Sequence, residues 1–388
     1  MPFYFDYNAT TPVSPEVRQV LDAVACEAFG NASSIHSYGQ AARRYVDEAR
    51  DRVAAFLGCD AKEVVFTSGG TEADNLAVLG TVRAATGRRH VITTAIEHEA
   101  VLASCEHLAE SGEAELTVLP VDGEGRVDPD DVRRAIRPET VLISVMHANN
   151  ETGVIQPLEE IVDIAREAGV RVHSDGVQAA GKITVDVSAL GVDLYAISGH
   201  KNYAPKGTGV LYVKKDTVLA PLLFGGRGEN GYRAGTQNVP GSVALGAAAH
   251  WKRSHLAQEA AHVGAHRNRL EQSLMERLPA VAVNGGGAQR VPNTANVRFD
   301  GIEAEALVIA LDLKGFAVST GAACSSGAVE PSHVLTAMGL SKEKAKSSIR
   351  FSLGRWTTDE EVDGLIEAVV ESVERLRKVS ATFQVHAG

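Results

Sequence analysis

The chain has 388 residues and a formal net charge of −11, from 38 basic and 49 acidic side chains, which argues against nucleic acid as the main partner. With 44% hydrophobic and 22% charged residues, the composition is that of an ordinary soluble protein, and no apolar run approaches the roughly 20 residues that span a bilayer. No secretory signal is visible at the N-terminus, so we expect a cytosolic protein without direct membrane contact. The length predicts two domains.

In the first two thirds of the chain, strand and helix patterns alternate. A helix is predicted to begin at Ser14, an N-cap followed by proline and glutamate, and a second helix is predicted over 38–57. The alternation that follows predicts an α/β fold with a mostly parallel, seven-stranded sheet covered on both faces. The strands are expected at 63–67, 90–94, 116–119, 141–146, 170–174, 194–198 and 209–213, with helices at 98–110, 129–137 and 158–168.

The last third predicts a smaller α+β domain. A long helix is expected over 239–278, followed by strands near 296–299, 317–319 and 348–353 with helices between and after them. We therefore expect a large domain over residues 14–250 and a small domain formed by residues 1–13 and 251–388. His262 and His266 share one face of the long helix, where they suit either a metal pair or, as we expect from their charged neighbours, a solvated face.

The four cysteines lie far apart and form no CxxC pair, which fits neither a zinc site nor a disulfide framework. We expect Cys26, Cys59 and Cys105 to be buried small hydrophobic residues. Cys324 lies in Ser-Thr-Gly-Ala-Ala-Cys-Ser-Ser-Gly (319–327), which predicts a mobile, partly exposed loop. An accessible thiolate there suits the transfer of a sulfur atom, whereas a structural cysteine is the alternative.

One lysine follows the most apolar predicted strand. The segment Ser198-Gly199-His200-Lys201 comes directly after Leu-Tyr-Ala-Ile (194–197) and precedes a turn-rich stretch. A lysine held at a strand end can be desolvated, which leaves its amine partly neutral and able to form a Schiff base. The alternative is a solvated loop lysine, because most lysines are exposed.

Other candidate residues also follow predicted strands, at the edge where ligands of such sheets bind. The turn Ser-Gly-Gly-Thr (68–71) is either an anion site at a helix start or only a tight turn. Asp175 suits either a helix N-cap or a partner for a heteroaromatic nitrogen, and His98 suits either ring stacking or an exposed helix start. Asn150 supplies an amide at the same edge. Together with Lys201, these residues predict a pyridoxal-phosphate enzyme.

A substrate anchor is predicted in the strand at 348–353. Ser348, Arg350 and Ser352 would share one face of this strand, opposite three apolar residues. An arginine on such a face either binds a substrate carboxylate through two hydrogen bonds or forms a surface ion pair.

Six segments together resemble the cysteine desulfurases of the NifS/IscS group, in the class V aminotransferase family, over nearly the whole chain and in the family's order. They are residues 5–12, 67–75, 97–99, 146–153, 198–201 and 348–352. The resemblance implies a homodimer of pyridoxal-phosphate (PLP) fold type I, the aspartate aminotransferase-like fold. It also implies conversion of L-cysteine to L-alanine, with the sulfur carried on Cys324 as a persulfide and passed to an acceptor such as an iron–sulfur scaffold protein.

The resemblance also implies individual roles. Lys201 would form the Schiff base with the coenzyme, Asp175 would pair with the pyridine nitrogen, and His98 would stack on the ring and exchange protons. Cys324 would carry the persulfide and act as a transient iron–sulfur ligand, and its segment resembles the longer loop that delivers sulfur to scaffolds. The remaining implied contacts are to the phosphate (Gly70, Thr71, Ser198, His200), to the ring oxygen (Asn150, Gln178), to the neighbouring subunit's phosphate (Thr236) and to the substrate carboxylate (Arg350).

The sequence departs from the family's pattern at two places, and it leaves two rival functions open. Gly-Arg-Gly-Glu-Asn-Gly at 226–231 differs from the family's pattern and affects the expected subunit contacts, while Gly176, where alanine is common, is expected to matter little. The rivals are a selenocysteine lyase or aminotransferase on the same fold, and an iron–sulfur assembly component without turnover. Lys201, Asp175 and His98 count against the second rival. The acceptor stays open between iron–sulfur assembly, tRNA thiolation and other routes.

Overall fold

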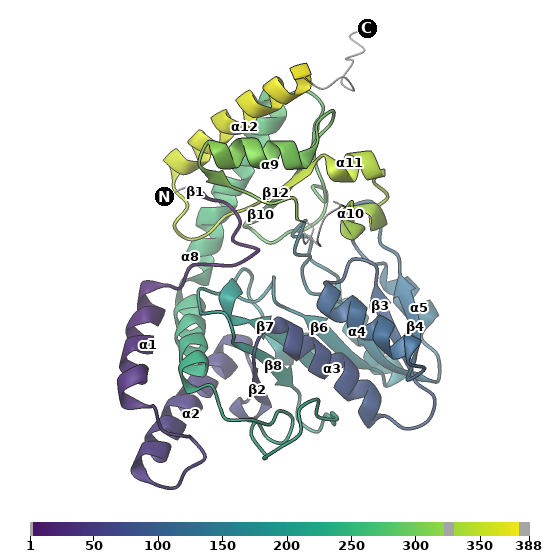
Figure 1. Cartoon of the computed structure of the whole chain (residues 1–388). Helices are drawn as coiled ribbons and strands as arrows, with labels where there is room; N and C mark the ends of the chain where they lie inside the picture. Colours follow the sequence, from purple (N-terminus) through teal and green to yellow (C-terminus); the bar gives the residue numbers. More distant parts are fainter. Residues whose placement is uncertain (1–2, 322–329, 380–388) are drawn as a thin grey trace.

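A seven-stranded sheet forms the centre of the larger part of the molecule (Figure 1). The computed structural model describes residues 3–321 and 330–379. The strand order is β2-β8-β7-β6-β5-β3-β4, and only β8 runs antiparallel to its neighbours, so the predicted, mostly parallel sheet is confirmed. The strands are β2 (Val64–Thr67), β3 (His90–Thr94), β4 (Glu115–Leu119), β5 (Thr140–Ser144), β6 (Arg171–Asp175), β7 (Leu194–Ser198) and β8 (Gly209–Val213).

Helices cover both faces of this sheet because its strands are apolar on both sides. Val65 and Leu194 pack with α3, whereas Val64 and Tyr195 belong to the cluster on the opposite face, beneath α2 and α8. Ser14 caps the first helix as predicted, with its Oγ 3.3 Å from the Val17 nitrogen. The helices of this part are α1 (Pro15–Glu27), α2 (Ser37–Leu57), α3 (Gly70–Ala84), α4 (Glu99–Glu110), α5 (Pro129–Ala135), α6 (Leu158–Ala168) and α7 (Val187–Leu190), with short 3₁₀ turns η1 (Ala61–Glu63) and η2 (Gly199–Lys201).

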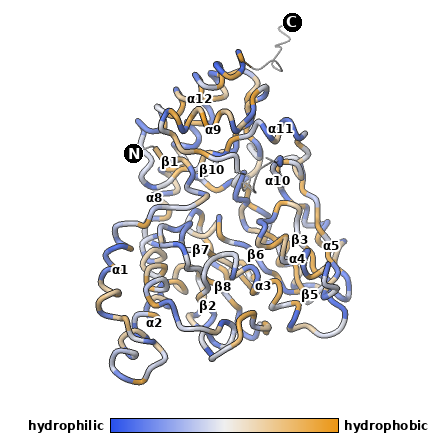
Figure 2. Tube along the Cα trace, viewed as in Figure 1, coloured by the Kyte–Doolittle hydropathy of each residue, from blue (hydrophilic) through white to orange (hydrophobic). Residues whose placement is uncertain are grey.

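The smaller part combines two short sheets with helices packed on them. β12 (Ser348–Ser352), β10 (Thr294–Phe299) and β9 (Val281–Val283) form an antiparallel sheet, and β1 (Phe3–Tyr4) pairs in parallel with β11 (Phe316–Ala317). The predictions lacked β1 and β9, which are too short for an alternation pattern. The helices are α9 (Ala304–Leu313), α10 (His333–Ala337), α11 (Lys342–Lys346) and α12 (Asp359–Val379). Hydrophobic and hydrophilic residues alternate along α12, which buries its apolar side (Figure 2).

One long helix, α8 (Val239–Arg277), runs between the two parts (Figure 1). Its first half packs in the large-sheet cluster up to Ala249, and its second half enters the small-part cluster from Val263 onward. The division into residues 14–250 and 1–13 plus 251–388 remains our proposal, and its boundary would fall within this helix. Among the described residues, none of the helices is both long and apolar enough to cross a membrane.

Two expectations about cysteine and histidine burial are wrong. Cys26 is exposed, because α1 buries a different face through Val17 and Val24, while Cys59 is half-buried and Cys105 is buried as expected. The histidines of α8 do not form a solvated face: His266 is buried, with Nδ1 2.8 Å from the His262 carbonyl oxygen. His262 Nε2 lies 2.9 Å from the Thr357 oxygen, which ties α8 to the start of α12. Within the described ranges, no cluster of three or more metal-ligating side chains occurs.

The expectation that Gly176 matters little is also wrong. A Cβ placed on Gly176, directly after β6, would lie 2.0 Å from Cε1 of Tyr195 on the neighbouring strand β7. The Tyr195 ring is fully buried, and its hydroxyl lies 2.7 Å from His147 Nδ1. Because the ring is held at both ends, it has no room to yield to a methyl group.

We expect Gly176→Ala to lower the free energy of unfolding of the coenzyme-free protein by about 1–3 kcal/mol through overpacking, as measured by urea denaturation. In a Tyr195→Leu background the same substitution should lower it clearly less, because the ring that meets the new methyl is gone. Equal losses in the two backgrounds would contradict this account.

Candidate functional site

The candidate site lies where several strand ends meet. β3, β5, β6 and β7 are mutually parallel, and β2 shares their direction because two antiparallel pairings through β8 separate it from β7. The carboxyl ends of these strands therefore lie along one edge of the sheet. The segments that leave this edge carry the sequence-predicted residues His98, Asn150, Asp175, Lys201 and the turn that opens α3.

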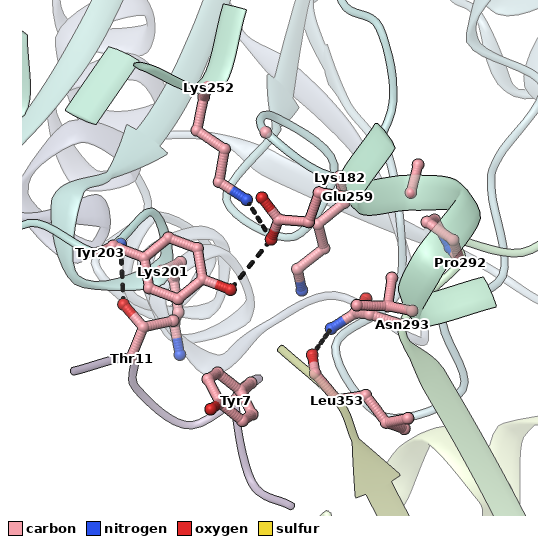
Figure 3. Close-up of a pocket in the computed structure, with 13 residues that line it drawn as sticks. Tyr7, Thr11, Lys182, Lys201, Tyr203, Lys252, Glu259, Pro292, Asn293 and Leu353 are labelled. Carbon is pink, nitrogen blue, oxygen red and sulfur yellow. Dashed lines mark hydrogen bonds and ion pairs between the residues drawn. The ribbon is translucent and has the colours of Figure 1, made fainter. Parts of the chain in front are cut away.

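Lys201 ends the η2 turn after β7, and its amine is held by backbone carbonyls of the N-terminal segment. Lys201 Nζ lies 2.5 Å from the Asn8 oxygen and 2.8 Å from the Ala9 oxygen. Burial, and next the nearby Arg350 guanidinium, lower the pKa of Lys201 to about 8. The amine borders a small pocket that Tyr7, Tyr203 and two further lysines line (Figure 3). The lowered pKa raises the neutral fraction of this amine near neutral pH, and the neutral form is the nucleophile.

The N-terminus of α3 and the end of β7 together form an anion cradle. α3 begins at Gly70 with Gly69 as its N-cap and without a side-chain cap, so its first N–H groups remain available. Ser198 is buried, and its Oγ has no hydrogen-bond partner among the described residues. A Cβ on Gly70 would lie 2.9 Å from Val177 Cγ2 and 3.6 Å from Ser198 Cβ, so the segments after β2, β6 and β7 converge here. Thr71 is exposed beside them.

His200 lies beside this cradle in its neutral form. Its Nδ1 is 3.2 Å from the Thr10 hydroxyl. Burial, with a smaller effect from the Lys201 charge, lowers the pKa of His200 to about 4. A neutral histidine presents one N–H donor to an anion rather than a charge.

Asp175 ends β6 in a fully enclosed environment. Its Oδ1 accepts a hydrogen bond of 2.9 Å from the Val177 nitrogen. Burial raises the pKa of Asp175, while the nearby His98 and Lys201 act in the opposite direction. Asp74 of α3 and Glu97 are buried close by, and burial raises the pKa of Glu97 to about 8. The region therefore favours a cationic partner that would keep Asp175 ionised.

His98, Asn150 and Gln178 complete the same edge. His98 is the exposed N-cap of α4, where its Nδ1 accepts from the Ala100 nitrogen at 3.1 Å. Asn150 is half-buried, and Gln178 is buried with its Nε2 donating to the Asn8 oxygen at 3.1 Å. His98 therefore caps α4 and also lies at the edge of the candidate site, so the two interpretations of this residue are compatible.

Arg350 comes from the smaller part of the molecule and is buried rather than on a surface. Its Nη2 lies 2.8 Å from Asp6 Oδ1, its Nη1 donates to the Asn150 oxygen at 3.1 Å, and its buried Nε has no partner among the described residues. The backbone of Arg350 pairs with Ser319, so the chain that leads toward residue 322 starts beside this guanidinium. An unpaired N–H in such a place suits recognition of a carboxylate.

The predicted sulfur carrier Cys324 lies outside the described residues. Its predicted role as a transient iron–sulfur ligand therefore stays a prediction. The flanking residues that are described both approach Glu151. Ser332 Oγ donates to Glu151 Oε2 at 2.6 Å, and a Cβ on Gly321 would lie 3.2 Å from the same oxygen. Glu151 directly follows Asn150, so both flanks lie at the edge of the candidate site.

The segment between β8 and α8 carries Thr236 and the departure at 226–231. Thr236 is exposed, as a residue that acts toward a neighbouring subunit would be. Glu229 of the departure is buried, with Oε2 2.8 Å from Arg50 Nη1 and 3.1 Å from the Phe66 nitrogen. This glutamate therefore anchors the segment within its own chain, against α2 and β2.

Sequence reasoning missed several residues of the site. Asn8 accepts from Lys201 and Gln178, and Lys182 reaches Asn8 from a turn after β6. Asp6 pairs with Arg350, and Asp74 lies against His173 at 3.4 Å. Asp6, Asn8 and Asp74 are all within segments that carry the family resemblance, which was the available signal, whereas Lys182 is outside them.

The residues at this edge fit pyridoxal phosphate. The unpartnered Ser198 hydroxyl and the uncapped α3 N-terminus suit a phosphate, and the buried Asp175 suits a protonated ring nitrogen. Lys201 supplies an amine of lowered pKa for the aldehyde.

Comparisons with known proteins agree with this assignment. The family described as Aminotransferase class-V matches residues 3–365. A protein named "Cysteine desulfurase IscS" from Anaeromyxobacter sp. (strain Fw109-5) is 48% identical over 99% of this chain and 96% of its own length. A solved "NIFS-LIKE PROTEIN" is similar with a TM-score of 0.90 and 36% identity, over 97% of this chain and 100% of that one.

A third similar protein was solved as "SspA in complex with cysteine", with a TM-score of 0.81 and 34% identity, over 92% of this chain and 100% of that one. These matches confirm the resemblance and the fold that the sequence motifs predicted. The chain belongs to the class-V aminotransferase family, and within that family to the cysteine desulfurases.

Proposed function

We propose that this protein converts L-cysteine to L-alanine and carries the released sulfur on Cys324 as a persulfide for transfer to an acceptor. The observation that supports this most strongly is the desolvated amine of Lys201 at the same sheet edge as Asp175 and the uncapped start of α3. Two comparisons support cysteine as the substrate: similar proteins are named cysteine desulfurases, and one similar structure was solved in complex with cysteine.

The residues that would hold pyridoxal phosphate follow from the site. The start of α3 with Gly70 and Thr71, together with Ser198 and His200, would bind the phosphate. Asp175 would pair with the ring nitrogen, His98 would stack on the ring, and Asn150 and Gln178 would contact the ring oxygen. When bound, the coenzyme supplies an electron sink that makes the substrate Cα proton acidic.

The protein's own groups would then divide the chemistry. Arg350 binds the substrate carboxylate, and the neutral Lys201 amine takes the Cα proton. His98 exchanges the protons of the thiols. The Cys324 thiolate attacks the substrate sulfur, so that a sulfur–sulfur bond forms while the carbon–sulfur bond breaks and leaves its electron pair on the substrate carbon. That carbon takes up a proton, Lys201 returns a proton to Cα, and alanine leaves, with the persulfide on Cys324.

A homodimer and a sulfur-accepting protein are part of the proposal. Large apolar side chains are exposed on the α1–α2 connection and after β8, with Ile35 at 92% and Phe224 at 87% exposure, which supports burial against a second copy. Thr236 lies in the same segment as Phe224 and would reach the second copy's phosphate site. The acceptor would be an iron–sulfur scaffold or a thiolation factor. A cytosolic setting fits, because it keeps the Cys324 thiol reduced.

We expect Cys324→Ala to abolish sulfide release from L-cysteine while coenzyme binding stays at the parent level, because the sulfur then has no thiolate to accept it. Sulfide, alanine and keto-acid assays on the purified protein measure this. Cys26→Ala is the matched control, since it removes an exposed thiol that does not line the pocket beside Lys201 and should leave sulfide release unchanged. Sulfide release at the parent rate by Cys324→Ala would contradict the proposal, and keto-acid formation would indicate an aminotransferase.

We expect the rate of coenzyme uptake by the coenzyme-free protein to rise with pH around a midpoint near 8, because only the neutral Lys201 amine reacts and burial lowers its pKa to about 8. Stopped-flow absorbance would measure the rate. Arg350→Leu should move the midpoint upward, since a charge that lowers the pKa of Lys201 is lost, and Asp6→Asn should move it downward. A midpoint near 10 in the parent protein would refute the role of desolvation.

A further inference from the structure

The pocket beside Lys201 contains a second buried lysine that the proposed chemistry does not use. Lys182 is only 9% exposed, and its amine points into the pocket (Figure 3). Its Nζ donates to Asn8 Oδ1 at 2.7 Å and to Gln178 Oε1. Burial, and next the charge of Lys201, lower the pKa of Lys182 well below its usual range, yet a lysine amine donates hydrogen bonds in either protonation state.

The contacts of Lys182 determine which end of the Gln178 amide faces which neighbour. Lys182 donates to one end of the Gln178 amide, which presents Oε1 to it. At the other end, Gln178 Nε2 donates to the Asn8 backbone oxygen at 3.1 Å, and a carbonyl oxygen accepts only an N–H. The two contacts agree on one orientation. Nε2 keeps a second hydrogen, for which the described residues provide no recorded acceptor.

Lys182 also helps to orient Asn8, whose Oδ1 accepts a second hydrogen bond, of 3.1 Å, from Asn293 Nδ2. Because Asn8 Oδ1 accepts from Lys182, the Asn8 amide group donates to the Asn150 oxygen at 3.1 Å and to Thr294 Oγ1 at 2.9 Å. The Asn8 backbone oxygen is then the shared acceptor of Gln178 Nε2 and Lys201 Nζ. Lys182 therefore lies behind two of the groups that border the Lys201 amine.

We propose that Lys182 is a positioning residue that holds Gln178 with its N–H toward the coenzyme's ring oxygen. This inference rests on the proposed function, in which Gln178 contacts that oxygen. In the opposite orientation Gln178 would present an oxygen to an oxygen, which repels instead of binding. Lys182 thus acts through Gln178 and not on the substrate.

The neighbouring Lys252 provides a matched control within the same pocket. It is also buried, but its Nζ pairs with Glu259 Oε1 at 2.7 Å and lies 4.7 Å from the centre of the Tyr203 ring (Figure 3). It has no recorded contact with Gln178 among the described residues. A substitution of Lys252 therefore removes a lysine from the pocket without altering the Gln178 amide.

A double-mutant cycle tests the proposal. The dissociation constant for pyridoxal phosphate is measured on coenzyme-free Lys182→Met, Gln178→Leu, the double variant and Lys252→Met. We expect Lys182→Met and Gln178→Leu each to weaken binding about tenfold, the loss of one buried hydrogen bond. The double variant should be no weaker than Gln178→Leu alone, and Lys252→Met should stay within twofold of the parent. A double variant about a hundredfold weaker, with independent losses, overturns the proposal.

A second readout separates positioning from general damage to the fold. The pH at which the loaded protein changes its visible absorbance reports the proton at the Lys201 linkage. Loss of a donor to the ring oxygen should raise this midpoint by about one pH unit in Lys182→Met and in Gln178→Leu alike. If Lys182→Met only damaged the fold, the protein that still binds coenzyme would show the parent midpoint. An unchanged midpoint therefore also counts against the proposal.

A near-isosteric variant covers the case in which Lys182→Met does not fold. Gln178→Glu keeps an oxygen for Lys182 but offers no N–H to the coenzyme or to the Asn8 oxygen, so we expect about tenfold weaker coenzyme binding by a protein whose circular dichroism shows that it is folded. Parent-level binding by Gln178→Glu would show that no donor is needed there. If the parent protein itself takes up no pyridoxal phosphate, the proposed function fails, whereas normal uptake with independent losses in the cycle rejects only the role of Lys182.

Discussion

A lysine amine is a nucleophile only while it is neutral, and the site lowers the pKa of Lys201 so that a larger fraction of it is neutral. The strand β7 is buried on both faces, so the turn that follows it delivers the amine into a region with little water. Two backbone carbonyls, of Asn8 and Ala9, accept its hydrogens without contributing a full negative charge. Had a carboxylate taken their place, it would have stabilised the ammonium form and raised the pKa of the amine. The nearby positive charge of Arg350 acts in the favourable direction.

The surroundings of this amine contain several buried ionisable groups, and most of them have a partner of opposite charge or a hydrogen bond. Arg350 is balanced by Asp6 and Lys252 by Glu259, whereas Asp175 has a single backbone donor. Buried charges of this kind do little for stability, since desolvation offsets most of their attraction. Their cost is tolerated where chemistry requires it, which is why perturbed ionisable groups concentrate at functional sites. The incomplete pairing of Asp175 leaves it with capacity for a ligand.

Sequence patterns predicted those parts of the site whose position depends on a single short segment of the chain. The apolar run before Ser198 predicted the bounds of β7, and the motif residues at strand ends predicted Lys201, Asp175 and the α3 turn. Such patterns could not predict contacts between segments that are far apart in the sequence. Lys182 meets Asn8 across 174 positions, and nothing near either residue signals the pairing. Gly176 was misjudged for the same reason, because the Tyr195 ring that fills its space comes from the neighbouring strand.

The N-terminal segment links the beginning of the chain to its end. Phe3 pairs with Phe316, Asp6 forms a bridge with Ser352 and an ion pair with Arg350, and the next residues supply the carbonyls that hold Lys201. During synthesis on the ribosome, residues 3–6 must therefore wait until β11 and β12 have been made before they find their place. The large sheet has all its strands long before that moment, so the nascent protein has a framework for the coenzyme but not yet a finished reaction centre. The reaction centre can therefore form only after β12 has been synthesised.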